Sequence, residues 1–254
     1  MDSTILQGAQ LSGGSRAVEL GLITLKGTKS LANIMFILGL ATAVGILYMS
    51  FLNTGSTSNA YYSAIIALIG VLVGYFYTAK PIRLSSRYGL GELSIFLSFG
   101  PLLTLGTGFA IANETILLYS NEFYNLLLLG VPIGLLTTNI LFINQYPDHA
   151  SDKKVGKNHL VVLLGKKASR WIYALNLILA LGSLYFIAEN ILTGTKQMLF
   201  LYMLIPITMF YSYFLLSGLF KYYNSRKLIK YNIHTIYFHM FFSFIYMIIL
   251  ANFQ

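Results

Sequence analysis

Seven long apolar stretches, separated by short polar segments, dominate this sequence. They lie at about 31–51, 61–79, 93–112, 124–144, 171–189, 198–217 and 233–251. Each is close to the ~20 residues that an α-helix needs to cross ~30 Å of hydrocarbon at ~1.5 Å per residue. We therefore expect an all-α protein, a polytopic transmembrane helical bundle of about seven spans, in which residues 1–254 form one membrane-embedded domain.

The composition agrees with a membrane protein. Of 254 residues, 56% are hydrophobic and only 10% are charged, whereas roughly a quarter are charged in an ordinary soluble domain. One soluble core cannot absorb so much apolar sequence at this length, so lipid must solvate part of it. The chain has no cysteine, which excludes disulfides and Cys-based metal or redox sites.

The basic residues predict how the chain is oriented in the membrane. Sixteen of the 17 Lys and Arg residues fall in the segment before the first span and in the loops after the second, fourth and sixth spans. The opposite loops hold Lys196 alone, together with Glu114, Glu122 and Glu189. Short loops rich in Lys and Arg stay in the cytoplasm. We therefore expect an integral protein of the cell membrane with cytoplasmic basic loops, and we do not attribute the net charge of +9 to nucleic-acid binding.

The segment 144–157 carries the densest polar pattern. If the preceding helix continues past Pro147, Asn144, Asp148 and Asp152 are spaced i, i+4, i+8 and share one face. Two carboxylates and an amide oxygen suit Mg²⁺, which uses few protein carboxylates and lets substrate phosphates complete its octahedron. Three lysines follow and would neutralise a polyanion: Lys153, Lys154 and Lys157. An ordinary solvated loop that caps a helix would account for the same spacing equally well.

A second polar cluster lies between the second and third spans. Pro81 suits the first turn of a new short helix, along which Lys80, Arg83 and Arg87 would fall on one side. This side is interpreted as either an anion site or a positive anchor at the lipid headgroups. Considered without the other motifs, this loop is better interpreted as the anchor at the lipid headgroups.

Three motifs, in order and at matching spacing, resemble the UbiA-type aromatic prenyltransferases, in particular the branch that prenylates 1,4-dihydroxy-2-naphthoate for menaquinone. The first is Tyr77-Thr78-x-x-Pro81-x-x-Leu84-x-x-Arg87-x-Gly89-x-Gly91-Glu92. The second is Asn144-x-x-Pro147-Asp148-x-x-x-Asp152-Lys153-x-Val155-Gly156-Lys157, continued by Leu160-Val161-Val162-x-Leu164-Gly165. The third, Gly13-Gly14-Ser15-Arg16 followed by Gly21 and Ile23, is similar to the segment after that family's first aspartate motif.

The resemblance implies a reaction and a set of site residues. In the family, Mg²⁺ held by two aspartate motifs binds a prenyl diphosphate, basic side chains promote its ionisation, and the allylic carbon attacks an electron-rich aromatic ring. The polyprenyl tail would lie along lipid-facing helices. By resemblance, Asp148 and Asp152 bind metal and Asn144 is their neighbour in the motif. The same resemblance gives the candidate contacts to the diphosphate: Tyr77, Lys80, Arg87, Lys157 and, with least support, Arg16.

The chain departs from the family pattern at its start. Four spans precede the second motif where the family has six, and the first aspartate motif would lie upstream of Met1, with Asp2 as its trailing acid. We therefore expect a member that lacks two helices and half of the metal site, as a fragment, a mis-called start or a diverged form, and that transfers prenyl groups poorly.

Other functions remain open on the sequence. They are a catalytically silent membrane protein, a family member using hydroxybenzoate or an archaeal glycerol-phosphate lipid as acceptor, and a transporter. The transporter is disfavoured because the span interiors are nearly free of charge. His149 and His159 are expected to be loop residues, and His234 and His239 do not share a helix face. Asn139 and Asn176 are expected either to line a cavity or to join helices.

Overall fold

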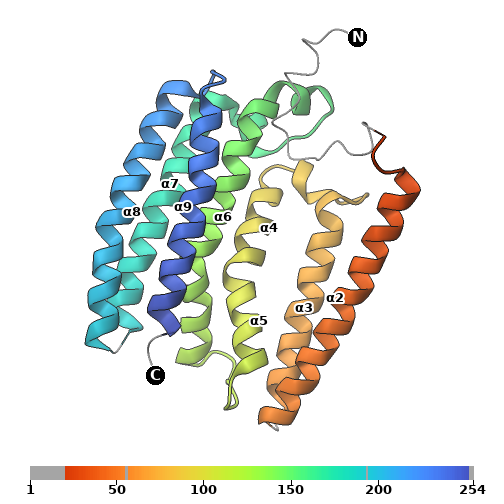
Figure 1. The fold of residues 1–254 in the computed structure, drawn as a ribbon, viewed down its shortest axis with the longest axis vertical. Coiled ribbons are helices and arrows are strands. Elements are labelled where there is room, and N and C mark those ends of the chain that lie inside the picture. The colour runs from red at the N-terminus through yellow and green to blue at the C-terminus, as the bar shows by residue number, and fades with distance from the viewer. Residues whose placement is uncertain (1–20, 55–56, 193, 252–254) are drawn as a thin grey trace.

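The computed structural model describes residues 21–54, 57–192 and 194–251. Along the chain, the elements are α2 (Leu25–Thr54), α3 (Thr57–Thr78), the short 3₁₀ turn η1 (Leu84–Ser86), α4 (Leu90–Phe99), α5 (Pro101–Ile111), α6 (Asn121–Lys154), α7 (Leu160–Asn190), α8 (Thr195–Tyr222) and α9 (Leu228–Ala251). The helices stand side by side, with α2 and α3 at one flank of the molecule and α6–α9 at the other (Figure 1). The described residues form no strand beyond one isolated bridge.

Seven helical segments in the described part of the chain are long and apolar enough to cross a membrane, with α4 and α5 together forming one of them. The predicted all-α bundle of about seven spans is confirmed. Several helices extend beyond the apolar stretches. In particular α6 has 34 residues, about 50 Å at ~1.5 Å per residue, and is therefore longer than the ~30 Å hydrocarbon layer.

The span formed by α4 and α5 is broken at Gly100, and Pro101 occupies the first turn of α5. This break lies against Gly130 and Gly134 of α6. A Cβ atom built at Gly134 would lie 2.5 Å from the Phe96 carbonyl oxygen and 3.0 Å from the Gly100 Cα. Small residues four apart on a helix allow two backbones to approach this closely in a membrane. The close contact sets the position of α4–α5 against α6.

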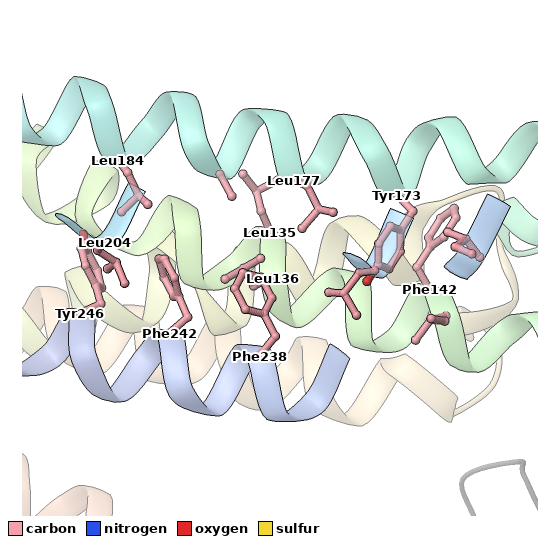
Figure 2. Packing of buried hydrophobic residues seen from close by; sticks show 14 of the residues in the cluster. Leu135, Leu136, Phe142, Tyr173, Leu177, Leu184, Leu204, Phe238, Phe242 and Tyr246 are labelled. Carbon is pink, nitrogen blue, oxygen red and sulfur yellow. The ribbon is translucent and has the colours of Figure 1, made fainter. Parts of the chain in front are cut away.

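The core lies among α6, α7, α8 and α9. Figure 2 shows Phe238 and Phe242 of α9 facing Leu136 of α6, with Leu177 and Leu184 of α7 on the opposite side of α6. All five side chains are almost fully buried. Helix α6 also packs against α4 and α5. It is therefore the central helix of the bundle.

Candidate functional site

The acidic pattern of the sequence lies on the last three turns of α6. The helix continues through Pro147 and ends at Lys154, with Lys153 and Lys154 in its last turn. Asn144, Asp148 and Asp152 are therefore on one continuous helix, so the spacing i, i+4, i+8 places them on one face, as the sequence predicted. Lysines in the last turn also suit the negative end of the helix dipole.

Asp152 is held by two partners that follow it in the chain. Lys157 Nζ lies 2.7 Å from Asp152 Oδ1, and His159 Nε2 lies 3.2 Å from Asp152 Oδ2. The chain reverses at Gly156, whose φ of +74° lies in the left-handed region that glycine adopts without a steric cost. After this turn the Lys157 N–H donates to the Asp152 carbonyl oxygen at 3.0 Å. The turn thus brings Lys157 and His159 back onto the acid.

Asp148 is half-buried and interacts electrostatically with Asp152 and Lys157. Among the described residues, no basic side chain forms a direct ion pair with it. Two neighbouring carboxylates, only one of them paired, repel each other unless a cation lies close to both. Asn144, one turn earlier, accepts a hydrogen bond at Oδ1 from Asn232 Nδ2 of α9.

These side-chain oxygens suit Mg²⁺ if they supply only part of its coordination and substrate oxygens supply the rest. The described residues contain no group of three or more His, Cys, Asp or Glu side chains arranged to hold a metal. A site built from two carboxylates is still appropriate for Mg²⁺, which usually binds through one or two carboxylates with water and substrate phosphates as the remaining ligands.

The basic loop between α3 and α4 differs from the prediction. The helix expected to begin at Pro81 does not form, and the loop contains only the three-residue turn η1. Arg83 just before it has φ of +47°, which interrupts helical geometry. The helical spacing that placed Lys80, Arg83 and Arg87 on one side therefore does not apply.

Arg87 folds back onto its own loop. Its Nη2 donates to the Pro81 carbonyl oxygen at 2.8 Å, and its Nε donates to the Ile82 carbonyl oxygen. A guanidinium has five N–H donors, so the remaining ones are left for an anion. Lys80, at the start of the loop, is exposed.

Backbone hydrogen bonds join the two motif loops. The Tyr88 N–H donates to the Asn158 carbonyl oxygen at 2.8 Å, and the Asn158 N–H donates to the Ser86 carbonyl oxygen at 3.1 Å. Arg87 is therefore paired with Asn158, next to Lys157. Two basic clusters about seventy residues apart in sequence meet at one end of the bundle.

Glu92, at the start of α4, is a residue for which the sequence analysis gave no role. It is buried, and its Oε1 accepts from Gln145 Nε2 of α6 and from the Leu160 N–H of α7, each at 3.0 Å. This single carboxylate ties together three helices around the motif loops. Its place in the run Gly89-x-Gly91-Glu92 was the only signal in the sequence. Tyr77 is half-buried and interacts electrostatically with Glu92.

The other predicted residues fall into clear groups. Arg16 lies outside the described residues. His149 was expected to be a loop residue, but it lies within α6 because that helix continues past Pro147 to Lys154. His159 lies between α6 and α7, as expected, where it is buried and caps the N-terminus of α7. Asn176 Nδ2 donates to Asn139 Oδ1 at 2.9 Å, so these two residues join helices.

His234 and His239 bond to different partners. His234 pairs with Tyr211 and His239 pairs with Thr137.

Comparison with known proteins identifies the family. The chain is 32% identical over 161 residues to 2-carboxy-1,4-naphthoquinone phytyltransferase of Synechocystis, covering 61% of this chain and 46% of the relative. It is 30% identical over 112 residues to 1,4-dihydroxy-2-naphthoate octaprenyltransferase of Bacillus subtilis, covering 44% and 33%. It is 37% identical over 100 residues to the Escherichia coli protein of the same name, covering 39% and 29%.

The matched region thus spans less than half the length of each of these relatives. No solved structure gives a significant match. The sequence profile of the UbiA prenyltransferase family matches residues 15–246, which is most of the chain. The chain therefore belongs to the UbiA prenyltransferase family.

Proposed function

We propose that this protein transfers a polyprenyl group from a prenyl diphosphate to an aromatic acceptor such as 1,4-dihydroxy-2-naphthoate. The observation that carries the proposal is the pair Asp148 and Asp152 on one face of α6, beside Lys157. The loop that holds Lys157 is hydrogen-bonded to the loop that holds Arg87. The names of the relatives support the choice of acceptor, since three of them act on naphthoate or naphthoquinone compounds.

In this proposal the two aspartates hold Mg²⁺ and Asn144 is their neighbour on the same face. When bound, Mg²⁺ supplies a Lewis acid that stabilises the negative charge on the departing diphosphate. Lys157, Arg87, Tyr77 and Lys80 bind the diphosphate oxygens and orient the C–O bond that breaks. Fixed cationic donors of this kind stabilise the charge that develops in the transition state. A C–C bond then forms between the allylic carbon and the electron-rich ring as the C–O bond breaks and diphosphate leaves, and the ring carbon restores its aromaticity by losing its proton to water.

The apolar tail of the donor needs a path away from this polar end. Tyr77 lines a cavity of about 330 Å³ between α3 and α4. This cavity shares Gly70 and Ser98 with a second, largely apolar cavity of about 430 Å³ that reaches Ile111 at the far end of α5. We call these two cavities the α3–α5 seam. An extended polyprenyl chain in the seam would have its diphosphate beside Tyr77 and its tail among apolar side chains.

The test uses the full chain, purified in lipid nanodiscs with Mg²⁺, farnesyl diphosphate and either 1,4-dihydroxy-2-naphthoate or 4-hydroxybenzoate, with products identified by mass spectrometry. Prenylated naphthoate is the expected product. Replacing Asp148 by Asn should lower the rate by ~10²–10³, the usual loss for one well-placed stabilising group, while the protein still inserts and folds.

Glu114→Gln, an exposed carboxylate far along the chain from both motifs, is the matched control and should keep the wild-type rate. Absence of any prenylated product from both acceptors, or an Asp148→Asn variant as active as the wild type, would contradict the proposal.

A further inference from the structure

His159 is the most deeply buried polar group beside the acidic face, and the reaction proposed above does not use it. Its side chain is 2% exposed. It lies between the Gly156 turn and the first turn of α7, where it is the N-cap residue. A buried imidazole needs partners for both ring nitrogens, and this one has both.

The two contacts define which ring nitrogen carries the proton. The Val162 N–H in the first turn of α7 is shared between the His159 carbonyl oxygen at 3.0 Å and His159 Nδ1 at 3.4 Å, so Nδ1 is the weaker of its two acceptors. A neutral imidazole that accepts at Nδ1 carries its hydrogen on Nε2. His159 Nε2 therefore donates to Asp152 Oδ2, 3.2 Å away.

Asp152 thus has a different donor on each oxygen, and the two donors differ in rigidity. Lys157 is 40% exposed and lies at the end of a flexible stem, although its bond to Asp152, which is 14% exposed, is the shorter of the two at 2.7 Å. His159 is rigid, because its ring is buried and its backbone starts a helix. The direction of the Asp152 carboxylate is therefore set mainly by His159.

We propose that His159 is a positioning residue that fixes Asp152 in the orientation needed to hold a divalent cation; this inference rests on the proposed function. The buried ring holds Asp152 Oδ2 from one fixed direction, whereas the Lys157 ammonium reaches Oδ1 on a flexible stem. Each carboxylate oxygen has about two lone-pair sites, so Oδ2 can accept from His159 and still bind a cation. Loss of such an outer partner commonly weakens metal binding ~10- to 100-fold.

Two substitutions separate the contacts of His159. His159→Asn keeps an acceptor at the Nδ1 position, and Asn is a good N-cap residue, but it removes the donor to Asp152. His159→Gln places an amide N–H near the former Nε2 position but lacks the acceptor that caps α7. The first variant should keep the wild-type Tm and lose magnesium affinity, and the second should lower the Tm and keep magnesium affinity.

Magnesium affinity is measured as the Mg²⁺ concentration needed for farnesyl diphosphate to bind the full chain in nanodiscs, by calorimetry. His159→Asn should raise the required Mg²⁺ concentration ~10- to 100-fold. His159→Gln should leave that concentration within about threefold of the wild-type value. A purely structural role predicts instead that affinity falls in step with Tm in both variants. That pattern, or wild-type affinity in His159→Asn, would overturn the inference.

A second measurement tests the hydrogen bond between His159 and Asp152 directly. In protein labelled with ¹⁵N-histidine, the His159 ring should carry its hydrogen on Nε2, and that hydrogen should exchange slowly with water. Asp152→Ala should accelerate the exchange. A hydrogen on Nδ1, or no response to Asp152→Ala, would contradict the positioning role. A wild-type chain that binds no diphosphate at any Mg²⁺ concentration would instead overturn the proposed function, and with it this inference, whatever the histidine spectrum shows.

Discussion

Helices α2 and α3 differ sharply from α6 and α7 in how much of their surface other helices cover. Only 6% of the most apolar window of α2, and 6% of that of α3, is buried, against 50% for α6 and 44% for α7. All four are apolar enough to cross a membrane. Hydropathy alone therefore does not distinguish a lipid-facing span from a central one, because lipid tails solvate apolar side chains as well as a protein core does.

A polar contact of α2 shows the same difference, whereas α3 is joined to α5 by Ser63, whose hydroxyl donates to the Gly106 carbonyl oxygen at 3.1 Å. On α2, Thr42 donates to the Leu38 carbonyl oxygen of its own helix. In the bundle, the hydroxyls of Tyr173 and Thr235 pair between α7 and α9 at 2.8 Å, and Asn176 bonds Asn139 between α7 and α6. In a membrane, such bonds and close packing join helices because apolar burial gives no preference for a neighbouring helix over lipid.

The candidate site lies where these two regions meet. The bundle holds Asp148 and Asp152 at the end of α6. The last turn of α3 contributes Tyr77, and the loop after it contributes Lys80 and Arg87. A well-packed helix can keep two carboxylates in place, while the less buried helices around the α3–α5 seam leave space for an apolar chain. The two kinds of packing suit two different parts of one substrate.

The largest expected effect tests whether both regions place their basic loops on the same side of the membrane. Cysteine introduced at Tyr88 in the α3–α4 loop or at Ser225 in the α8–α9 loop should react with an impermeant thiol reagent only in inverted vesicles. Both positions are exposed, the chain has no other cysteine, and basic loops stay in the cytoplasm. Cysteine at Asn113, exposed before α6, is the control and should react only from the outside.

Labelling of Tyr88→Cys and Ser225→Cys from opposite sides would place the α3–α4 and α8–α9 loops on opposite faces of the membrane, and the orientation predicted from the basic loops would be wrong.

The second prediction concerns the close approach of α6 to α4–α5. Gly134→Ala should lower the free energy of unfolding by ~1–3 kcal/mol or more, the usual cost of overpacking, since its Cβ would meet backbone atoms that cannot move aside. Gly39→Ala on α2 is the matched control, because its Cβ would meet nothing within 4 Å. It should leave stability unchanged or raise it slightly through helix propensity.

Both free energies are measured by reversible denaturation in the same detergent. Equal losses at Gly134 and Gly39 would show that α2 is packed as tightly as the bundle, and the contrast between the two regions would be wrong.

The sequence predicted the spans and the acidic face well because both depend on local periodicity. Apolar length predicts a crossing helix, and the spacing of Asn144, Asp148 and Asp152 is a property of any continuous helix. The family resemblance also rested on spacing, and comparison confirmed it. For the spans and for the end of α6, local periodicity was therefore sufficient.

The contacts between loops could not be predicted in that way. The return of Lys157 and His159 onto Asp152 depends on one left-handed residue, Gly156, and the bond from Tyr88 to Asn158 joins segments far apart in sequence. The helix expected from Pro81 was wrong because Arg87 satisfies the carbonyl oxygens of its own loop instead. The bond from Tyr88 to Asn158 is a tertiary contact. The other two arise from loop conformations and side-chain bonds within a few residues, so none of the three follows from apolar or helical periodicity.

The smallest expected effect tests whether interhelical hydrogen bonds distinguish the bundle from α2. Asn176→Leu removes the bond to Asn139 Oδ1 and should cost ~0.6 kcal/mol, the average for such bonds in membranes, with an upper value of ~1.7 kcal/mol. Asn139 is fully buried and would retain its other bond, from Nδ2 to the Tyr173 carbonyl oxygen at 3.1 Å. Thr42→Val on α2 removes a bond that stays within one helix, so its effect should be close to zero. The loss of unfolding free energy is measured for both variants in one detergent. The double variant Asn139→Leu/Asn176→Leu shows how much of the loss comes from the bond between the two residues rather than from either side chain alone. If Asn176→Leu is neutral while Thr42→Val destabilises, hydrogen bonds between helices do not hold the bundle, and the packing of residues such as Gly134 must account for its cohesion alone.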